Sequence, residues 1–413
     1  MRTNLTPQTP ITLGKMILSS TTDIRIKRRL RRARRTPLIW LLVLGIVLVI
    51  GLIAIGWLLV TWEASAILMA FPALVPLAIV WFSVHWLDRW EPEPPLLLAM
   101  CFLWGGGASI LGTLIAGNFL LEVAASTVAK NMDIEAFSLL VQGPVVEEIM
   151  KSLGVVIVLL IAWREVHGLL DGFVYAAMIG SGFAFTENIV YFASSGSTGL
   201  DFVWLLVVRG ILSPFAHVVF TGAIGLALGW AVRRREPLHF VIAGLVGTVV
   251  AVGLHSMWNG GSLYLLPFIG VDPNNPFAWI ISYAVFQLPL FILFGYVLVQ
   301  LQFQDQEIIR MRLGEYRRAG WFTASEVRMI SNWQERKTAV AWAKQQSPAV
   351  RDALLAFVRD ATRLAFAREH ASVDKRDRQR RIREKELLEQ TRADRNLLNE
   401  LTNAKAPTES PQA

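Results

Sequence analysis

Acidic, basic and histidine side chains interrupt four of the long apolar runs of this sequence. In chain order these residues are Glu147, Glu148, Lys151, Glu187, Arg209, His217 and His255. An ionisable side chain inside a bilayer costs on the order of 3 kcal/mol on insertion scales, so a stable span carries one only where it serves a site. We therefore expect these residues to line one common polar site.

The spacing within the runs places several of these groups on shared helix faces. Glu148 and Lys151 are three residues apart, and Phe183 and Glu187 are four apart, and both spacings bring side chains together on an α-helix. The supporting roles that we expect are charge compensation by Lys151 and Arg209, packing by Phe183, shaping of the site by Asn188, and orientation of the histidines or the substrate by Thr221 and Asn259.

Two chemistries suit this set of residues. His217, His255 and Glu148 can hold a divalent metal ion such as zinc, which lowers the pKa of bound water and polarises a carbonyl group. Alternatively, Glu147 or Glu148 acts directly as a general base on water, while histidine and asparagine stabilise the oxyanion. Both routes hydrolyse a peptide bond, and the residues leave both open. The sequence has no HExxH, GxSxG or P-loop motif.

The composition is that of a membrane protein. Of the 413 residues, 54% are hydrophobic and only 17% are charged, and the mean hydropathy is +0.46. Soluble domains carry about 25% charged residues. The net charge of +8 fits basic residues gathered on the cytoplasmic side of a membrane better than a nucleic-acid partner, which we do not expect. The single cysteine, Cys101, excludes an internal disulfide and a cysteine metal site.

A spanning helix needs about twenty apolar residues, and this criterion predicts an all-α bundle of about eight spans. The predicted spans are 38–60, 66–86, 96–117, 144–163, 171–194, 204–232, 239–258 and 277–301. With both termini in the cytoplasm, the inside loops contain Arg89, Arg164 and 233–235, whereas the outside loops contain one lysine, Lys130. This charge bias satisfies the positive-inside rule.

This topology also sets the depth of the polar residues. The glutamates and His255 fall in the outer half of the membrane and His217 falls near the middle, at 1.5 Å of rise per residue. A shared depth on four consecutive helices favours one convergent site. Taken singly, each residue has a structural interpretation: the glutamates can be hydrated or paired with Lys151, and the histidines can be neutral core residues.

Changes in composition along the chain divide it into three segments. Residues 1–36 form a basic cytoplasmic arm, residues 37–302 form the transmembrane domain, and residues 303–413 form a charged, helix-forming cytoplasmic tail. Opposite charges recur three or four residues apart in 373–402, as in a solvated helix, and 404–413 has the composition of a disordered end. We expect the tail to bind a cytoplasmic partner whose identity the sequence does not give.

The motifs resemble the PrsW family of intramembrane proteases, distant relatives of the CAAX prenyl proteases. The resemblance covers about residues 85–260. It rests on four motifs in order: Glu147-Glu148-x-x-Lys151, Phe183-x-x-x-Glu187-Asn188, His217-x-x-x-Thr221 and His255-x-x-x-Asn259. The segments 88–94 (DRWEPEP) and 171–175 (DGFVY) are also similar to that family.

The resemblance implies a multi-pass protease of the bacterial plasma membrane. By the family pattern, Glu147, Glu148, Glu187, His217 and His255 carry the chemistry. The implied substrate is a membrane-anchored protein, such as an anti-sigma factor, cut near the extracytoplasmic face. Two alternatives are an ion-coupled transporter, since intramembrane carboxylates and histidines also make ion pathways, and a non-catalytic scaffold that acts through the tail.

Overall fold

The computed structural model of the chain describes residues 38–127, 133–163, 165–195, 199–234, 236–373 and 378–403. The predicted arm 1–36, the predicted disordered end 404–413, and Lys130, Arg164 and Arg235 lie outside these residues. Within the described ranges every regular element is a helix, which confirms the all-α prediction.

The first half of the described chain carries the elements up to the end of the third motif. They are α2 (Leu38–Leu87), α3 (Pro95–Leu103), η1 (Trp104–Ser109), α4 (Ile110–Thr127), α5 (Ile134–Phe137), η3 (Ser138–Gln142), α6 (Gly143–Ile161), α7 (Leu169–Ser194), α8 (Leu200–Val207), η4 (Val208–Leu212) and α9 (Ala216–Arg234).

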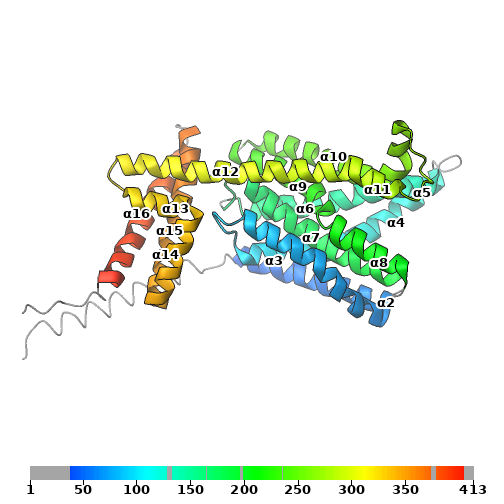
Figure 1. The fold of residues 1–413 in the computed structure, drawn as a ribbon, viewed down its shortest axis with the longest axis horizontal. Coiled ribbons are helices and arrows are strands. Elements are labelled where there is room, and N and C mark those ends of the chain that lie inside the picture. The colour runs from blue at the N-terminus through cyan, green and yellow to red at the C-terminus, as the bar shows by residue number, and fades with distance from the viewer. Residues whose placement is uncertain are drawn as a thin grey trace, which may run out of the picture. The chain divides into compact units, whose positions relative to one another are not determined.

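The second half begins with the last motif and ends with the tail helices (Figure 1). Its elements are α10 (Pro237–Gly260), η5 (Gly261–Leu265), η6 (Leu266–Ile269), α11 (Ala278–Ser282), η7 (Tyr283–Gln287), α12 (Leu288–Arg318), α13 (Ala324–Ser331), α14 (Trp333–Gln346), α15 (Pro348–Val373) and α16 (Arg378–Asn403).

Six helical segments of the described chain are long and apolar enough to cross a membrane, so the protein is a multi-pass membrane protein. They are Leu38–Leu87, Pro95–Ala124, Leu169–Ser194, Leu200–Arg234, Pro237–Ile269 and Ala278–Arg318. The outward faces of these helices are rich in exposed leucine, isoleucine, valine and phenylalanine. Such a surface suits lipid, because a bilayer interior solvates apolar side chains.

Two features separate these six segments from the predicted eight. The helix α2 runs for 50 residues but breaks at Glu63, whose φ of 49° is left-handed, so its two halves run in different directions (Figure 1). The helix α6 is long enough at 19 residues, but it contains the three charged residues Glu147, Glu148 and Lys151 and is therefore not among the six. The count of eight and the orientation of the termini remain predictions.

The helix α7 is the central helix of the bundle, packing against α9 on one side and against α3 and η1 on the other (Figure 1). Glycines make these contacts close. A Cβ atom on Gly182 would lie 2.1 Å from the carbonyl oxygen of Phe102, and one on Gly225 would lie 2.3 Å from that of Gly172. Small residues allow membrane helices to approach in this way, because association there depends on packing.

We predict that Gly182→Ala destabilises the bundle by about 1–3 kcal/mol, because the new methyl group meets backbone atoms that cannot rotate away. The matched control is Gly253→Ala on α10, where a Cβ would meet nothing within 4 Å. Thermal unfolding of the purified protein measures both changes. Equal melting temperatures for the two variants would contradict the close packing of α7.

The tail helices form a second hydrophobic core that includes a residue from the loop between α2 and α3. This core contains Trp90 together with Ile309, Leu313, Phe357 and Leu364. The predicted boundary at residue 303 falls inside α12, which continues without interruption to Arg318 (Figure 1). Trp90 therefore packs with helices that lie more than 200 residues further along the chain.

Two arginines of the tail bind the same loop. Arg336 donates a hydrogen bond to the carbonyl oxygen of Trp90 at 3.0 Å. Arg363 donates to Glu91 at 3.1 Å and to Glu165 at 2.8 Å. Next to these contacts, the backbone N–H of Glu93 donates to Asp88 at 2.8 Å. The loop 88–94 thus anchors the tail helices through ion pairs and backbone hydrogen bonds.

Buried carboxyl groups make this loop sensitive to alkaline pH. Burial raises the pKa of Asp88 from 3.8 to about 8 and that of Glu91 from 4.5 to about 7, although Arg363 opposes the second shift. A folded-state pKa above the unfolded value means that the folded state retains a proton that the unfolded state has released. The stability that this proton confers is therefore lost as the pH rises towards 8.

We predict that the free energy of unfolding falls between pH 7 and pH 8 by about 1 kcal/mol and then levels off, and that Asp88→Asn removes most of this fall. The asparagine side-chain oxygen can still accept the hydrogen bond from Glu93. Exposed Asp201 provides the control Asp201→Asn, which should retain the wild-type pH profile. Unfolding curves at pH 7, 8 and 9 provide the measurement, and a fall that persists in Asp88→Asn would contradict the assignment.

Candidate active site

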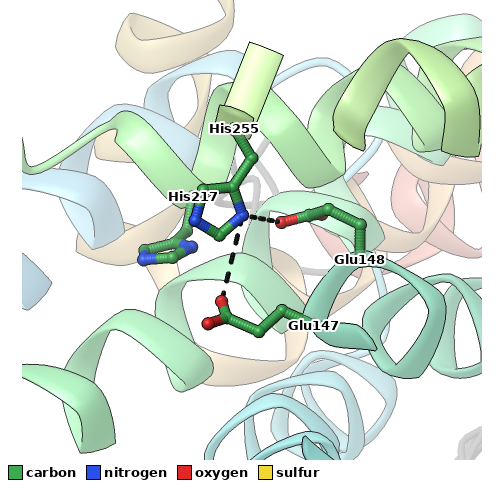
Figure 2. A group of neighbouring side chains, drawn as sticks. All are labelled: Glu147, Glu148, His217 and His255. Carbon is green, nitrogen blue, oxygen red and sulfur yellow. Dashed lines mark hydrogen bonds and ion pairs between the residues drawn. The ribbon is translucent and has the colours of Figure 1, made fainter. Parts of the chain in front are cut away.

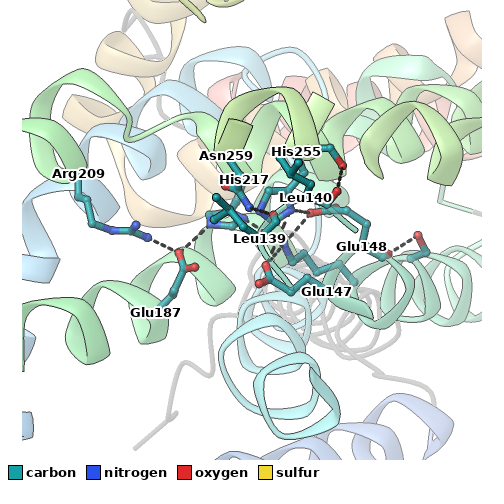
Figure 3. A network of polar contacts seen from close by, with 12 residues as sticks. Leu139, Leu140, Glu147, Glu148, Glu187, Arg209, His217, His255 and Asn259 are labelled. Carbon is teal, nitrogen blue, oxygen red and sulfur yellow. Dashed lines mark hydrogen bonds and ion pairs between the residues drawn. The ribbon is translucent and has the colours of Figure 1, made fainter. Parts of the chain in front are cut away.

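The polar residues predicted from four apolar runs lie together in the structure (Figure 3). The helix α6 contributes the two adjacent glutamates and Lys151, α7 contributes Glu187, α9 contributes His217 and α10 contributes His255. Arg209 comes from η4, a π-helical turn just before α9. Such turns widen a helix locally and occur often at functional sites.

Lys151 lies at the centre of this network. Its Nζ atom is 2.8 Å from Glu148, 3.3 Å from Glu147 and 3.0 Å from Nδ1 of His217. It also lies 3.8 Å from the ring centroid of Phe183. The side chains of Lys151 and Glu148 are both fully buried. The ammonium group therefore replaces its lost hydration by two carboxylates, an imidazole nitrogen and an aromatic face.

His217 joins Lys151 to a second group of charges. Because an ammonium group can only donate, Nδ1 of His217 accepts from Lys151 and carries a lone pair. In the neutral ring the proton then sits on Nε2, which donates to Glu187 at 2.8 Å. Glu187 thereby fixes the orientation of the ring and leaves Nδ1 directed at the centre of the site.

Arg209 neutralises Glu187 at Oε2, the same oxygen that His217 contacts. Its guanidinium forms an ion pair with Glu187 and donates from Nε to Asn188 at 2.6 Å. The same guanidinium lies over the ring of Tyr191 at 3.9 Å. These contacts are those expected of a counter-ion. Asn188 holds the guanidinium of Arg209 in place by accepting the hydrogen bond from Nε.

His255 completes the network from α10. Its Nδ1 atom is 3.0 Å from Glu148 and 3.9 Å from Glu147. Its ring stacks on Phe220 at 4.9 Å and meets the ring of His217 edge-on at 5.3 Å. These two aromatic contacts hold the histidine against the glutamates.

Two of the predicted supporting residues, Asn259 and Thr221, form no hydrogen bond with the histidines among the described residues. Asn259 donates to the carbonyl oxygen of Leu139 at 2.9 Å, and the neighbouring Ser256 donates to that of Leu140 at 2.7 Å, so both tie α10 to η3 directly before α6. The hydroxyl oxygen of Thr221 is buried and has no hydrogen-bond partner among the described residues. Phe183 packs, as expected, but against the lysine and His217 of the site itself.

Sequence reasoning missed three side chains of the site: Tyr191, Phe220 and Ser256. Tyr191 lies four residues after Glu187 and Phe220 three after His217, so both share a helix face with a predicted residue. This spacing could have identified them. Ser256 lies next to His255 in the sequence, and its spacing does not place it on the same helix face as a predicted catalytic residue.

Four of the clustered residues fit a metal ion. One donor atom from each of Glu147, Glu148, His217 and His255 lies within 4.8 Å of the other three (Figure 2). Imidazole nitrogens and carboxylate oxygens are the donors that zinc prefers. The Oε2 atom of Glu148 is buried without a partner among the described residues, so it is free to coordinate. The pairing of Glu187 with His217 is the outer contact that ligating histidines usually make.

Comparisons with known proteins agree with this geometry. A family model described as PrsW family intramembrane metalloprotease matches residues 93–294. Protease PrsW of Clostridioides difficile (strain 630) is 31% identical over 177 residues, which cover 41% of this chain and 71% of that protein. This chain belongs to the PrsW family. The PrsW match includes every residue of the site from Glu147 to Asn259. No solved structure matches the chain.

The central lysine leads to a prediction about metal binding. Lys151→Met keeps an unbranched side chain that is one atom shorter, but it removes the cation from between the glutamates. Without metal, we expect a loss of stability of about 3–5 kcal/mol, because a buried charge loses its partner. We expect added zinc to raise the melting temperature of this variant more than that of the wild type, because no ammonium group competes for the same donors.

The control for this measurement is Lys337→Met, which makes the same chemical change at an exposed position of α14. Its response to zinc should equal that of the wild type. Equal zinc-induced shifts for Lys151→Met and Lys337→Met would show that zinc binds elsewhere on the protein.

Proposed function

We propose that this protein is an intramembrane endopeptidase that hydrolyses peptide bonds of membrane proteins. The observation that supports the proposal most directly is the buried cluster of Glu147, Glu148, His217 and His255, with donor atoms within 4.8 Å of one another. Membership of the PrsW family supports the same reaction class. Hydrolysis needs a base for water and a group that stabilises the oxyanion, and this cluster contains both.

The two glutamates suit different roles. The side chain of Glu148 is fully buried and bound by Lys151 and His255, whereas that of Glu147 is 15% exposed. In this proposal Glu147, which water can reach, takes the proton from the attacking water. Glu148 holds Lys151 and His255 in place through Oε1, and its Oε2 is buried without a partner among the described residues. His217, fixed by Glu187, presents Nδ1 to the same space.

His217, His255 and Glu148 would also hold a divalent metal ion, with zinc best matched to these donors, and Glu147 would stay free to act as the base. When bound, such an ion supplies Lewis acidity, polarising the scissile carbonyl group and acidifying a bound water molecule. Both forms of the reaction use Glu147 as the proton acceptor. The Lys151→Met measurement above separates a cluster that binds metal from one that does not.

The proposed substrate is a membrane-anchored protein in the bacterial plasma membrane, and an anti-sigma factor is one such protein. The positive-inside topology predicted from the sequence places the glutamates in the outer half of the bilayer. The cut would then fall near the extracytoplasmic end of a spanning helix of the substrate. A helix must unwind locally to expose a peptide bond, and helix ends fray most easily.

Cleavage by reconstituted protein tests this proposal. We predict that Glu147→Gln, Glu148→Gln and His217→Ala each lower cleavage of a single-span substrate about 100-fold or more, because each removes a proton-transfer or positioning group. The matched control is Glu135→Gln, an exposed glutamate of α5. Proteoliposomes and product sizes on gels provide the measurement. Wild-type cleavage by all three variants would remove the protease proposal.

A further inference from the structure

A polar cavity lies apart from the glutamate–histidine cluster, since none of the cluster residues lines it. It has a volume of about 520 Å³, and its lining includes Trp163, Arg233, His370, Arg383 and Glu386. It forms where the ends of α6 and α9 meet the tail helices α15 and α16. Cavities of this size are in the range of small-molecule sites, roughly 300–1,000 Å³.

The walls of the cavity are rich in positive charge. Three arginines, Arg233, Arg380 and Arg383, line it against one carboxylate, Glu386. Arg380 has a structural task, because it donates to the carbonyl oxygens of His370 at 2.9 Å and Arg233 at 2.8 Å. It thereby joins the ends of α9 and α15 and carries its charge into the cavity wall. The excess of positive charge favours an anionic ligand.

The histidines of the cavity are consistent with this positive field. His370 donates from its ring to the carbonyl oxygen of His167 at 2.8 Å, and the two rings stack 6.0 Å apart. Burial lowers the pKa of His370 to about 3, and neighbouring His167 and Arg233 add to the shift. The ring is therefore neutral near pH 7, and its one N–H is used by the bond to His167, so the arginines supply the charge of the cavity.

The lining also contains apolar residues, and part of it lies at the level where spans end. Trp163 follows the last residue of α6 by two positions and is 46% exposed, and Arg233 lies in the last turn of α9. Val166, Val232 and Leu387 complete this wall. Tryptophan and arginine at span ends mark the headgroup layer of a bilayer. A ligand in this cavity would therefore meet arginines at one side and apolar side chains at the other.

We propose that this cavity binds the phosphate-bearing headgroup of an anionic phospholipid and so ties α16 to the membrane helices. The shared chemistry is a phosphate ester, which arginine binds through two parallel hydrogen bonds. A lipid source fits better than a soluble phosphate because of the apolar wall and the position at the span ends. This inference does not depend on the proposed proteolysis, because none of the glutamate–histidine cluster lines the cavity.

The test compares the full-length protein in nanodiscs of phosphatidylcholine with and without phosphatidylglycerol. We expect phosphatidylglycerol to raise the melting temperature by about 2–4 °C, as bound ligands stabilise the folded state. The double variant Arg233→Gln/Arg383→Gln should lose this shift. The matched control, Arg234→Gln/Arg381→Gln, changes the adjacent exposed arginines, which do not line the cavity, and should keep the shift.

Two further measurements complete the test. One identifies the source of the phosphate, and the other keeps the test valid if a variant misfolds. Inorganic phosphate added to phosphatidylcholine nanodiscs should leave the melting temperature unchanged, and a shift that only the cavity variant loses would assign the site to soluble phosphate instead. Native mass spectrometry of the wild type should show retained phosphatidylglycerol in preference to phosphatidylcholine, whatever the fold of the variants. Equal shifts in all three proteins, or no retained anionic lipid, would overturn the proposal.

Discussion

The buried ammonium group of Lys151 is the interaction on which the rest of the site depends. Glu147 and Glu148 lie on the same helix as the lysine, but His217, the third polar partner, comes from α9. A buried charge is tolerated only while every partner stays in place, since losing one leaves an uncompensated charge. The bundle must therefore hold α6 and α9 at a fixed separation, and the central helix α7 is packed against both.

Close helix packing supplies that rigidity. The contact of Gly225 with Gly172 lets the backbones of α7 and α9 approach to a distance that no larger residue permits. Gly180 makes a similar approach to the carbonyl oxygen of His217 itself. The histidine that bridges Lys151 and Glu187 thus sits on a stretch of α9 whose backbone is fixed by contact with α7. A network of short polar contacts needs this fixed frame, because hydrogen bonds weaken steeply with distance and angle.

The sequence predicted the site better than it predicted the contacts of the tail. Glu148, Glu187, His217 and His255 stand out because ionisable residues are rare and costly in apolar runs, so their cost alone identifies them. The spacing of Phe220 from His217 indicates only a shared helix face, and it contains no information about the stacking of Phe220 on His255. The hydrogen bond from Arg336 to Trp90 joins residues 246 positions apart, and helical periodicity contains no information about such a pairing. The break of α2 at Glu63 falls in the gap between the predicted spans 38–60 and 66–86, where this charged residue separates two apolar runs of spanning length.

The loop 88–94 and the glutamate–histidine cluster are connected through one helix. At its start α7 carries Tyr175, whose hydroxyl donates to Glu93 of the loop, and near its other end it carries Glu187 of the site. Their separation of twelve positions corresponds to about 18 Å of helix. The tail binds that same loop through Arg336 and Arg363. A helix resists compression and bending over this length, so α7 is a stiff connection between the loop that the tail binds and the residue that orients the central histidine.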